Sequence, residues 1–437
     1  ILFFKIYFCW NPFIFIFKGK DSINWTNSKS RNGTLSSTPD FILIVSLKFN
    51  LAPILKVIKH RGPDSDGLYS SNELDAHLGH TRLSILDLSK NGHQPMEDHS
   101  KRYIITYNGE IYNFRELKVY IEKNYGKKNW QTGTDTEIIL EGFAAENKNF
   151  FSKLNGIYSL IIYDKKERHF HVIRDPVGIK PLYYTLQKGS AFFSSEIDGL
   201  LAIKGLSKSL RLQSFSDQLT HMYIPEPYTL FNEFLKVAPG LHIVFKDGKK
   251  LSENKISFIK NQSFDMNSFG IEECTVKFKD TLNSAVKRQL VSDVPISILL
   301  SGGLDSSAIT KLAMDNNAPI KSVYTISYSK EDKKFDDQGD DLFYAKKLSD
   351  ELGLKLNIIQ PNKNVLSLLE EIPSFMNDGV TDPASLNTFI ISKNARNDDI
   401  KVLLSGQGAD EYLCGYRRYL AEKLFSNLPN ALTFLLS

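Results

Sequence analysis

Residues 295–314 read PISILLSGGLDSSAITKLAM and contain the transition that decides the fold of the second half of the chain. The apolar run Pro295 to Leu300 ends at two adjacent glycines, and the helical spacing of Ala308 to Met314 follows, which predicts a buried strand, a tight turn and a helix. The pattern recurs at Lys401 to Leu404, which SGQGADE follows, and 322–328 is another strand-like run. Strands that alternate with helices indicate a doubly wound parallel sheet, where ligands bind at the carboxyl ends of the strands.

The turn SGGLDSS, residues 301–307, is the first candidate binding site. Gly302 and Gly303 permit a close approach of the backbone, and the N–H groups at the start of the helix favour an anion. The turn lacks the spacing of a Walker-type kinase or GTPase loop, and no GxGxxG follows a strand to indicate a dinucleotide site. A plain strand-to-helix turn is the alternative. The heptad resembles the pyrophosphate loop of the ATP pyrophosphatase superfamily.

Asp305 lies inside this turn, where its carboxylate would repel bound phosphates unless a cation lay between them. Mg²⁺ is the expected cation. The second strand-end turn, 405–411, supplies Asp410 and Glu411 as partners for the same ion. For Asp410 alone, helix capping is an equally good interpretation.

Composition excludes several classes of protein. The 437 residues include 54 Lys or Arg and 50 Asp or Glu, a net charge of +4 (54 − 50) that does not favour a nucleic-acid binder. Cys9, Cys274 and Cys414 are too few and too scattered for a disulfide framework or a zinc cluster, which is typical of a reducing cytosol. The length predicts two or three domains.

The first residues depart from this composition. Residues 1–17 hold fourteen apolar side chains, broken by Asn11 and Pro12. No basic region precedes the run, no cleavage site follows it, and it is short for a bilayer span, so an imperfect gene start is favoured over a membrane anchor. The stretch 21–39 has no periodicity and reads as a loop. We therefore expect 1–49 to be non-native or disordered.

The next part of the chain, 50–225, is expected to be a sheet-rich domain of mixed α/β type. A helix is predicted to begin at Thr134, where Glu137 three positions later completes a capping box. A polar connector is expected over 226–267, followed by the second domain at 268–437. Short strand-like runs lie at 103–107, 157–163, 169–173 and 191–194, and an amphipathic stretch lies at 114–123.

Five motifs lie in this first domain, and each of them alone could be an ordinary turn or loop sequence. They are HRGPD at 60–64, GHTRLSI at 79–85, YNGEIYN at 107–113, GTD at 133–135 and RDPVGIKP at 174–181. In this order, and ahead of the pyrophosphate loop, they resemble glutamine-dependent asparagine synthetase from about residue 50 to the end. The resemblance implies an α/β fold: an N-terminal-nucleophile-type glutaminase sandwich followed by a doubly wound parallel-sheet ATP pyrophosphatase domain.

The resemblance also implies a glutamine site in the first domain. Arg82 matches the arginine that holds the α-carboxylate of glutamine with bidentate donors. Asn108 and Gly109 match the oxyanion hole, and Glu110 and Asp135 match the groups that take the α-ammonium. The backbone of Leu83, Ser84 and Ile85 would line the same pocket.

For the second domain the resemblance implies ATP and Mg²⁺. The metal would lie near Asp305 and Asp410, and an aspartate side chain would be activated as an acyl-adenylate before ammonia attacks it. The expected partners are glutamine, aspartate and ATP, with no nucleic acid and no membrane, in the cytoplasm; a homodimer stays open. The implied ATP-binding residues are Leu299, Ser301, Gly302, Gly303, Leu304, Asp305, Ser306, Ile326, Ser405 and Gly406.

The chain departs from the family in three places. The family nucleophile is an N-terminal cysteine followed by Gly-Ile, but Cys9 is followed by Trp10 and lies 51 residues (60 − 9) before His60, so we expect glutaminase activity to be lost. Only 26 residues (437 − 411) follow Glu411, so we expect a truncated synthetase domain. Gln407 occupies a position where some relatives carry glutamate, and we predict that it is catalytic together with Asn108 and Gly109.

Two other functions stay open beside a truncated asparagine synthetase. One is a different adenylating amide ligase, such as a β-lactam-forming enzyme, which does not consume glutamine. The other is a catalytically silent protein that binds glutamine or ATP. The presence of Arg82, Asn108 and Asp135 favours glutamine ancestry over the first.

Overall fold

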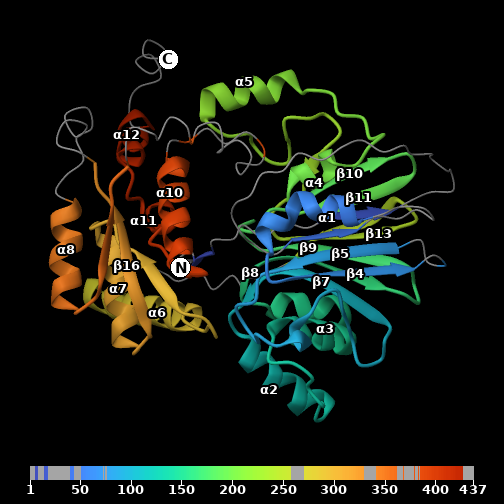
Figure 1. Cartoon of the computed structure of the whole chain (residues 1–437), viewed down its shortest axis with the longest axis horizontal. Helices are drawn as coiled ribbons and strands as arrows, with labels where there is room; N and C mark the ends of the chain where they lie inside the picture. Colours follow the sequence, from blue (N-terminus) through green and yellow to red (C-terminus); the bar gives the residue numbers. More distant parts are fainter. Residues whose placement is uncertain are drawn as a thin grey trace.

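The computed structural model in Figure 1 describes residues 51–71, 73, 76–256, 270–328, 341–361, 368, 378, 382 and 384–426. It also gives the backbone of three short strands within 1–49, where no element was expected: β1 (Lys5–Tyr7), β2 (Ile14–Phe17) and β3 (Asp40–Leu43). The predicted loop at 21–39 lies outside the described residues. None of the described helices is both long and apolar enough to span a bilayer.

The first half contains two antiparallel sheets. The six-stranded sheet has the order β14-β13-β9-β8-β7-β6, and the seven-stranded sheet has the path β12-β10-β11-β2-β5-β3, with β4 paired to β5. The strands are β4 (Ser65–Ser71), β5 (Ala76–Arg82), β6 (Met96–Glu97), β7 (Tyr103–Ile111), β8 (Gly156–Asp164), β9 (His169–Arg174), β10 (Tyr183–Gln187), β11 (Ser190–Ser194), β12 (Leu235–Lys236), β13 (Leu241–Lys246) and β14 (Lys249–Lys255).

Successive side chains along each strand face opposite sides of its sheet, which explains how the sheets and helices form layers. Ile104 of β7 faces the core between the two sheets with Leu78 and Phe193, whereas its neighbour Ile105 faces a second core together with Phe143. Helices cover both outer faces, so the order is helix, sheet, sheet, helix (Figure 1). This arrangement confirms the predicted sandwich. The helices of this half are α1 (Ala52–Ile58), α2 (Phe114–Tyr125), α3 (Asp135–Glu146), α4 (Ile197–Leu201) and α5 (Leu212–His221), with 3₁₀ turns η1 (Lys59–Arg61), η2 (Lys90–Gly92) and η3 (Asn147–Lys153).

The predicted connector at 226–267 is different in the structure. Its first part contains β12, β13 and β14, and β13 pairs with β9 through His242 opposite Ile173. Ile243 and Phe245 of β13 are fully buried in the core between the sheets, so this segment completes the first half. Residues 257–267 lie outside the described residues.

The strand-like runs of the first half coincide with β7, β8, β9 and β11, and the helix predicted at Thr134 is α3. Thr134 is its N-cap and accepts a hydrogen bond from the backbone N of Glu137. The Glu137 carboxylate does not return to the cap residue as a capping box requires. It accepts instead from the backbone N of Gln131 (2.9 Å) and of Thr132 (2.8 Å), which fixes the loop before the helix.

The second half is a parallel sheet with helices on both faces, which confirms the predicted doubly wound fold. The order is β1-β18-β15-β16-β17, with β1 antiparallel at the edge. Val286 of α6 and Ile309 of α7 cover one face, and Ile390 of α10 covers the other. The elements are α6 (Ile271–Gln289), β15 (Ile296–Leu299), α7 (Leu304–Asp315), β16 (Ile320–Ile326), α8 (Asp341–Glu351), β17 (Leu356–Ile359), α10 (Ala384–Asn397), β18 (Val402–Leu404), α11 (Ala409–Leu413) and α12 (Arg417–Ser426).

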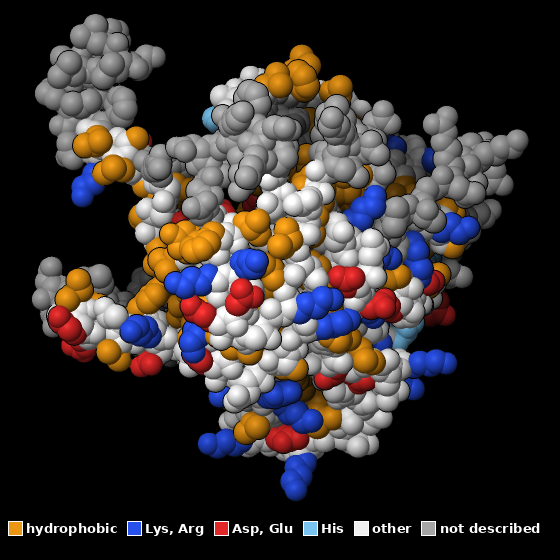
Figure 2. Space-filling model, turned by 60° about the vertical axis from the view of Figure 1, so that its left-hand side comes forward, with side chains coloured by type: hydrophobic (Ala, Val, Ile, Leu, Met, Phe, Trp, Pro, Cys, Tyr) orange, Lys and Arg blue, Asp and Glu red, His pale blue; other side chains and the backbone are white. Residues whose placement is uncertain are grey.

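The two halves share one apolar core. Leu83 and Ile85 of the first half belong to the same buried cluster as Val286 and Ile296 of the second. Outside this core, the described part of the face shown in Figure 2 has positive and negative side chains interspersed. That distribution agrees with the small net charge of the chain, +4.

Candidate functional site

A pocket opens between β5 and β7 of the facing sheets, where the first-half motifs converge. Six residues predicted for the glutamine site line it: Arg82, Leu83, Ile85, Gly109, Glu110 and Asp135. The other lining residues are His80, Leu86, Gly92, Gln94, Tyr107, Thr134 and Thr136. Segments from three motifs far apart in sequence therefore lie at one site.

Arg82 lies at the end of β5 and is 7% exposed. Its Nη1 donates to the backbone oxygen of Ser89 (2.8 Å), and its Nη2 donates to those of Leu86 (3.2 Å) and Asp87 (2.5 Å). Burial lowers the pKa of Arg82, and the carboxylates of Asp87, Asp64 and Asp135 oppose that effect. The guanidinium is a buried cation that stabilises the loop 86–89 through these hydrogen bonds, and it also lines the pocket.

Asp135 begins α3 and is buried. Its Oδ2 accepts from the hydroxyl of Tyr107 (2.7 Å) and from the backbone N of Ile111 (2.8 Å). Burial raises the pKa of Asp135, and the hydrogen bonds from Ile111 and Tyr107 reduce the rise. A carboxylate at a helix N-terminus, held by two donors, is a fixed site for an ammonium group.

Asn108 and Gly109 lie on β7, but only Gly109 lines the pocket. Gly109 has φ +152°, and a Cβ there would lie 2.1 Å from the backbone oxygen of Ile157, so a side chain is excluded. Asn108 is 1% exposed, and neither atom of its amide has a hydrogen-bond partner within the described part of the chain. Such a group costs about 1–3 kcal/mol, which requires an explanation beyond packing.

Ser84 also differs from the prediction, because it does not line the pocket. Its backbone N donates to Oδ2 of Asp64 in the HRGPD motif (2.7 Å). His80, Tyr107, Gln94 and Thr136 do line the pocket, although no role was predicted for them. Three of the four lie within or next to motifs already recognised, and alternation along β5 places His80 on the same face as Arg82.

Two of the five motifs are structural in this fold. In RDPVGIKP, Asp175 is buried and accepts from the backbone N of Ile179 (3.0 Å) and of Lys180 (2.9 Å), which closes the loop. In HRGPD, the buried Arg61 pairs with Glu196, which is 1% exposed. Neither Asp175 nor Arg61 lines the pocket.

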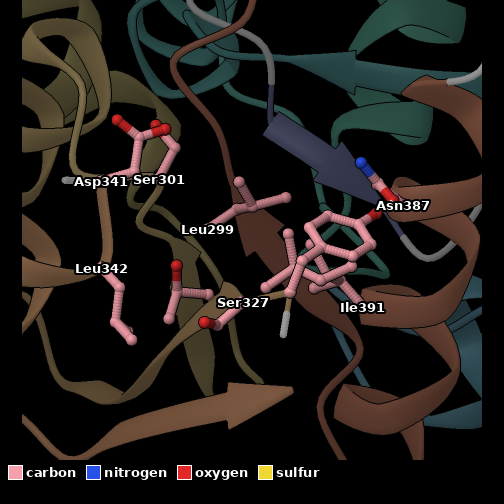
Figure 3. Close-up of a pocket in the computed structure, with 10 residues that line it drawn as sticks. Leu299, Ser301, Ser327, Asp341, Leu342, Asn387 and Ile391 are labelled. Carbon is pink, nitrogen blue, oxygen red and sulfur yellow. Dashed lines mark hydrogen bonds between the residues drawn. The ribbon is translucent and has the colours of Figure 1, made fainter. Parts of the chain in front are cut away.

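A second pocket lies at the carboxyl ends of β15 and β16, where a doubly wound sheet binds its ligands. Three residues predicted to bind ATP line it: Leu299, Ser301 and Ile326. Figure 3 shows Ser301 and Asp341 on one side and Asn387 and Ile391 on the other. The hydroxyl of Tyr328 donates to Oδ1 of Asn387. The remaining lining residues are Thr325, Ser327 and Leu342.

The turn 301–307 is fixed by its own hydroxyls. Oγ of Ser301 and Oγ of Ser306 are hydrogen-bonded at 2.9 Å, and the backbone N of Gly303 donates to Oγ of Ser301 (3.3 Å). Gly302 has φ +89°, and a Cβ there would lie 2.1 Å from the backbone oxygen of Asp341. The turn needs glycine at this position.

The two strand-end turns meet, as predicted. β15 and β18 are parallel neighbours, so both turns leave the same edge of the sheet. A Cβ at Gly406 would lie 3.0 Å from Cβ of Asp305 and 2.8 Å from the backbone N of Ser306. Leu304, also predicted to bind ATP, is 85% exposed and does not line the pocket.

Two carboxylates at this edge act on the pKa of Asp305. Burial raises the pKa of Asp305, and the charges of Asp410 and Glu411 raise it further. No group of three or more His, Cys, Asp or Glu with metal-site geometry occurs among the described residues, so protein ligands alone do not make a cage here. Two carboxylates together with phosphate oxygens are the donor set that Mg²⁺ prefers. Gln407 contributes a backbone N that donates to Oγ of Ser405 (3.2 Å).

Comparison with known families agrees with this division. Residues 44–255 match the glutamine amidotransferase domain family, and residues 277–436 match the asparagine synthase family. The chain is 31% identical over 389 residues to an asparagine synthetase [glutamine-hydrolyzing] 1 from Bacillus subtilis, covering 87% of this chain and 58% of that protein. It is 31% identical over 393 residues to a putative asparagine synthetase [glutamine-hydrolyzing] 2 from Methanocaldococcus jannaschii, covering 86% of this chain and 74% of that protein. It is 27% identical over 390 residues to the amidase chry2 from Gibberella zeae, covering 85% of this chain and 56% of that protein.

Proposed function

Because the chain belongs to the family of glutamine-hydrolysing asparagine synthetases, we propose that it is an ATP-dependent ligase that converts a carboxylate into an amide. The chain spans 58% of the Bacillus subtilis relative, so the activity and substrates of the whole protein are part of this proposal. The meeting of the two turns at Asp305 and Gly406 supports it most strongly, because the backbone N of Ser306 then lies near the carboxylates of Asp305 and Asp410, a setting suited to a phosphate and a cation.

The proposed reaction has two steps at the second pocket. A carboxylate oxygen of aspartate attacks the α-phosphorus of ATP, the bond to the bridging oxygen breaks, and pyrophosphate leaves. Ammonia then attacks the acyl carbon, AMP leaves, and one proton is released as the amide forms. Asp305 and Asp410 would hold Mg²⁺, which, when bound, neutralises phosphate charge, and the N–H groups of 301–306 would orient the phosphates.

Nitrogen would come from free ammonia, because we propose that the first pocket holds glutamine without releasing its amide nitrogen. Residues 51–256 contain no cysteine, and Cys274 and Cys414 do not line the pocket. Cys9 lies outside the described residues and is followed by Trp10 instead of the Gly-Ile of the family nucleophile. We therefore propose that the chain binds glutamine without hydrolysing it. A homodimer and a cytoplasmic location remain predictions.

Two assays on the purified chain test these proposals. Calorimetric titration with glutamine should show binding, while an enzymatic assay for glutamate shows no turnover. Release of pyrophosphate from Mg-ATP should depend on aspartate. Release that depends on another carboxylate instead would favour a different adenylating ligase, and no release with any amino acid would favour a silent binding protein.

Replacing Asn108 by alanine should separate stability from binding. We propose that the Asn108 amide, next to Gly109 on β7, belongs to the oxyanion hole, so its loss should lower glutamine affinity about tenfold. The amide has no partner among the described residues, so the free energy of unfolding should change by less than about 1 kcal/mol. Gln94→Ala is the matched control, because Oε1 of Gln94 accepts from the backbone N of Tyr107 (2.7 Å). Urea unfolding should show a loss of about 1–3 kcal/mol for the control alone. Equal losses in both variants would contradict the proposed role of Asn108.

Replacing Asp305 by asparagine should weaken the binding of Mg-ATP. The substitution removes one of two carboxylates proposed to hold the ion, so the dissociation constant for Mg-ATP should rise about tenfold or more at saturating Mg²⁺. Asp315→Asn, at the other end of α7 and paired with Lys311, is the control and should leave the constant unchanged. Isothermal titration measures both, and an unchanged constant in Asp305→Asn would exclude this residue from the metal site.

A further inference from the structure

Asp293 belongs to the second half of the chain, between α6 and β15, but it contacts the wall of the first pocket. Its backbone N donates to the backbone oxygen of Ile85 (3.0 Å). One of its carboxylate oxygens, Oδ2, accepts from the backbone N of Asp87 (2.7 Å), although the two residues are 206 positions apart. The segment 85–87 is thus held on two sides by one residue of the other half.

This segment holds the groups proposed to bind glutamine. Nη2 of Arg82 donates to the backbone oxygens of Leu86 (3.2 Å) and Asp87 (2.5 Å). The carboxylate of Asp87 accepts from the backbone N of Gly133 (2.8 Å), two positions before Asp135. A shift of 85–87 would therefore move both the arginine and the loop that precedes the carboxylate.

We infer that Asp293 is a positioning residue for glutamine, so that the first pocket reaches its full affinity only when the second half is docked against it. The inference rests on the proposed function of that pocket. Asp293 does not line the pocket and would not touch the ligand. It would act through the segment 85–87. Along the chain, the buried end of β5 precedes this segment and the exposed Leu88 follows it.

The size of the expected change in glutamine affinity follows from the solvent exposure of the hydrogen bond between Asp87 and Asp293. Asp293 is exposed and Asp87 is half-buried, so water competes for both groups. The carboxylate charge strengthens the bond, since charge-assisted hydrogen bonds are stronger than neutral ones. A moderate change in affinity is therefore expected, with the fold intact.

The test is calorimetric titration of the full chain with glutamine and, separately, with Mg-ATP. Asp293→Ala should raise the dissociation constant for glutamine about fivefold and leave that for Mg-ATP unchanged. Asp293→Asn should restore glutamine affinity to within about twofold, because its amide oxygen still accepts from the backbone N of Asp87. A purely structural role would weaken both ligands together and would not be rescued in this way.

The matched control removes another acidic group between the halves. Glu116 of α2 pairs with Arg288 of α6 (3.4 Å) and does not line the pocket, so Glu116→Gln should leave both constants unchanged. If the unaltered chain binds glutamine and Asp293→Ala binds it equally well, the inference is wrong and the proposed function stands. If the unaltered chain binds no glutamine, the glutamine site proposed for the first pocket is wrong and the inference falls with it, whereas the ligase proposed for the second pocket is tested separately by release of pyrophosphate.

Discussion

Replacing Gly302 by alanine should weaken the binding of Mg-ATP about a hundredfold, since backbone strain of about 3 kcal/mol in the binding conformation corresponds to that loss of affinity. The φ of +89° is unfavourable for any L side chain, and the new Cβ would lie 2.1 Å from the backbone oxygen of Asp341. That oxygen belongs to the start of α8, so it cannot turn aside as a flexible side chain would. The turn 301–307 must therefore move, and with it the N–H groups proposed to bind phosphate.

The adjacent glycine is the control for this result. Gly303 is the N-cap of α7 with φ −71°, and a Cβ there would lie no closer than 3.4 Å to Oγ of Ser301. Gly303→Ala should therefore retain affinity to within a few fold, although it also lies in the turn. Fluorescence titration with a labelled ATP analogue in the presence of Mg²⁺ compares the two. Similar affinities for both variants would show that the conformation of Gly302 does not matter for nucleotide binding.

The sequence predicted these strand-end turns because their signals are local. An apolar run, two glycines and a helical pattern lie within twenty residues, and parallel order then places both turns at one edge. Asp135 follows similar reasoning, because it begins the helix predicted at Thr134. No strand was predicted over β5, so Arg82 was expected in the site only through the resemblance of its motif to the family. The structure places both in one pocket.

Residues brought in by tertiary structure carry no such signal. Asp341 and Asn387 line the second pocket from helices without a recognised motif, and only the sheet order places them there. Asp293 looks like an ordinary loop acid until its bond to the backbone of Asp87 is seen. The connector predicted over 226–267 contains β13, because the short apolar run of this strand lies between polar segments and its pairing with β9 is non-local.

A second large effect is expected from two buried histidines when the pH falls. His171 of β9 and His242 of β13 are hydrogen-bonded through Nδ1 and Nε2 at 3.0 Å. Burial and the neighbouring His242 lower the pKa of His171 to about 3, and burial lowers the pKa of His242 to about 4. The ring of His171 packs on Phe143 of α3, the helix that begins at Asp135.

The direction in which stability changes with pH follows from the direction of these pKa shifts. Below pH 6.5 the unfolded chain takes up protons on both histidines while the folded chain does not, so the stability that their neutral forms provide is lost as the pH falls from 6.5 towards 3. The loss is about 1.4 kcal/mol per pH unit for each histidine, or about 3–4 kcal/mol for the pair by pH 5. Asp198 and Asp378 act in the opposite direction, because their pKa values are raised to about 6 and their contribution is present at low pH.

A double variant, His171→Leu with His242→Leu, isolates the histidines, because the carboxylates are the same in both proteins. Replacing both partners of a buried hydrogen bond by apolar groups of similar size is nearly neutral at pH 7.5, so the variant should become the more stable protein as the pH falls to 5. Urea unfolding followed by circular dichroism measures the difference, and His221→Leu, at the exposed end of α5, should behave like the parent. If the parent and the double variant lose stability in parallel, protonation of this pair is not what weakens the first half in acid. A growing difference would mean that acid acts on the packing beneath α3, and so on the helix that positions Asp135 in the pocket.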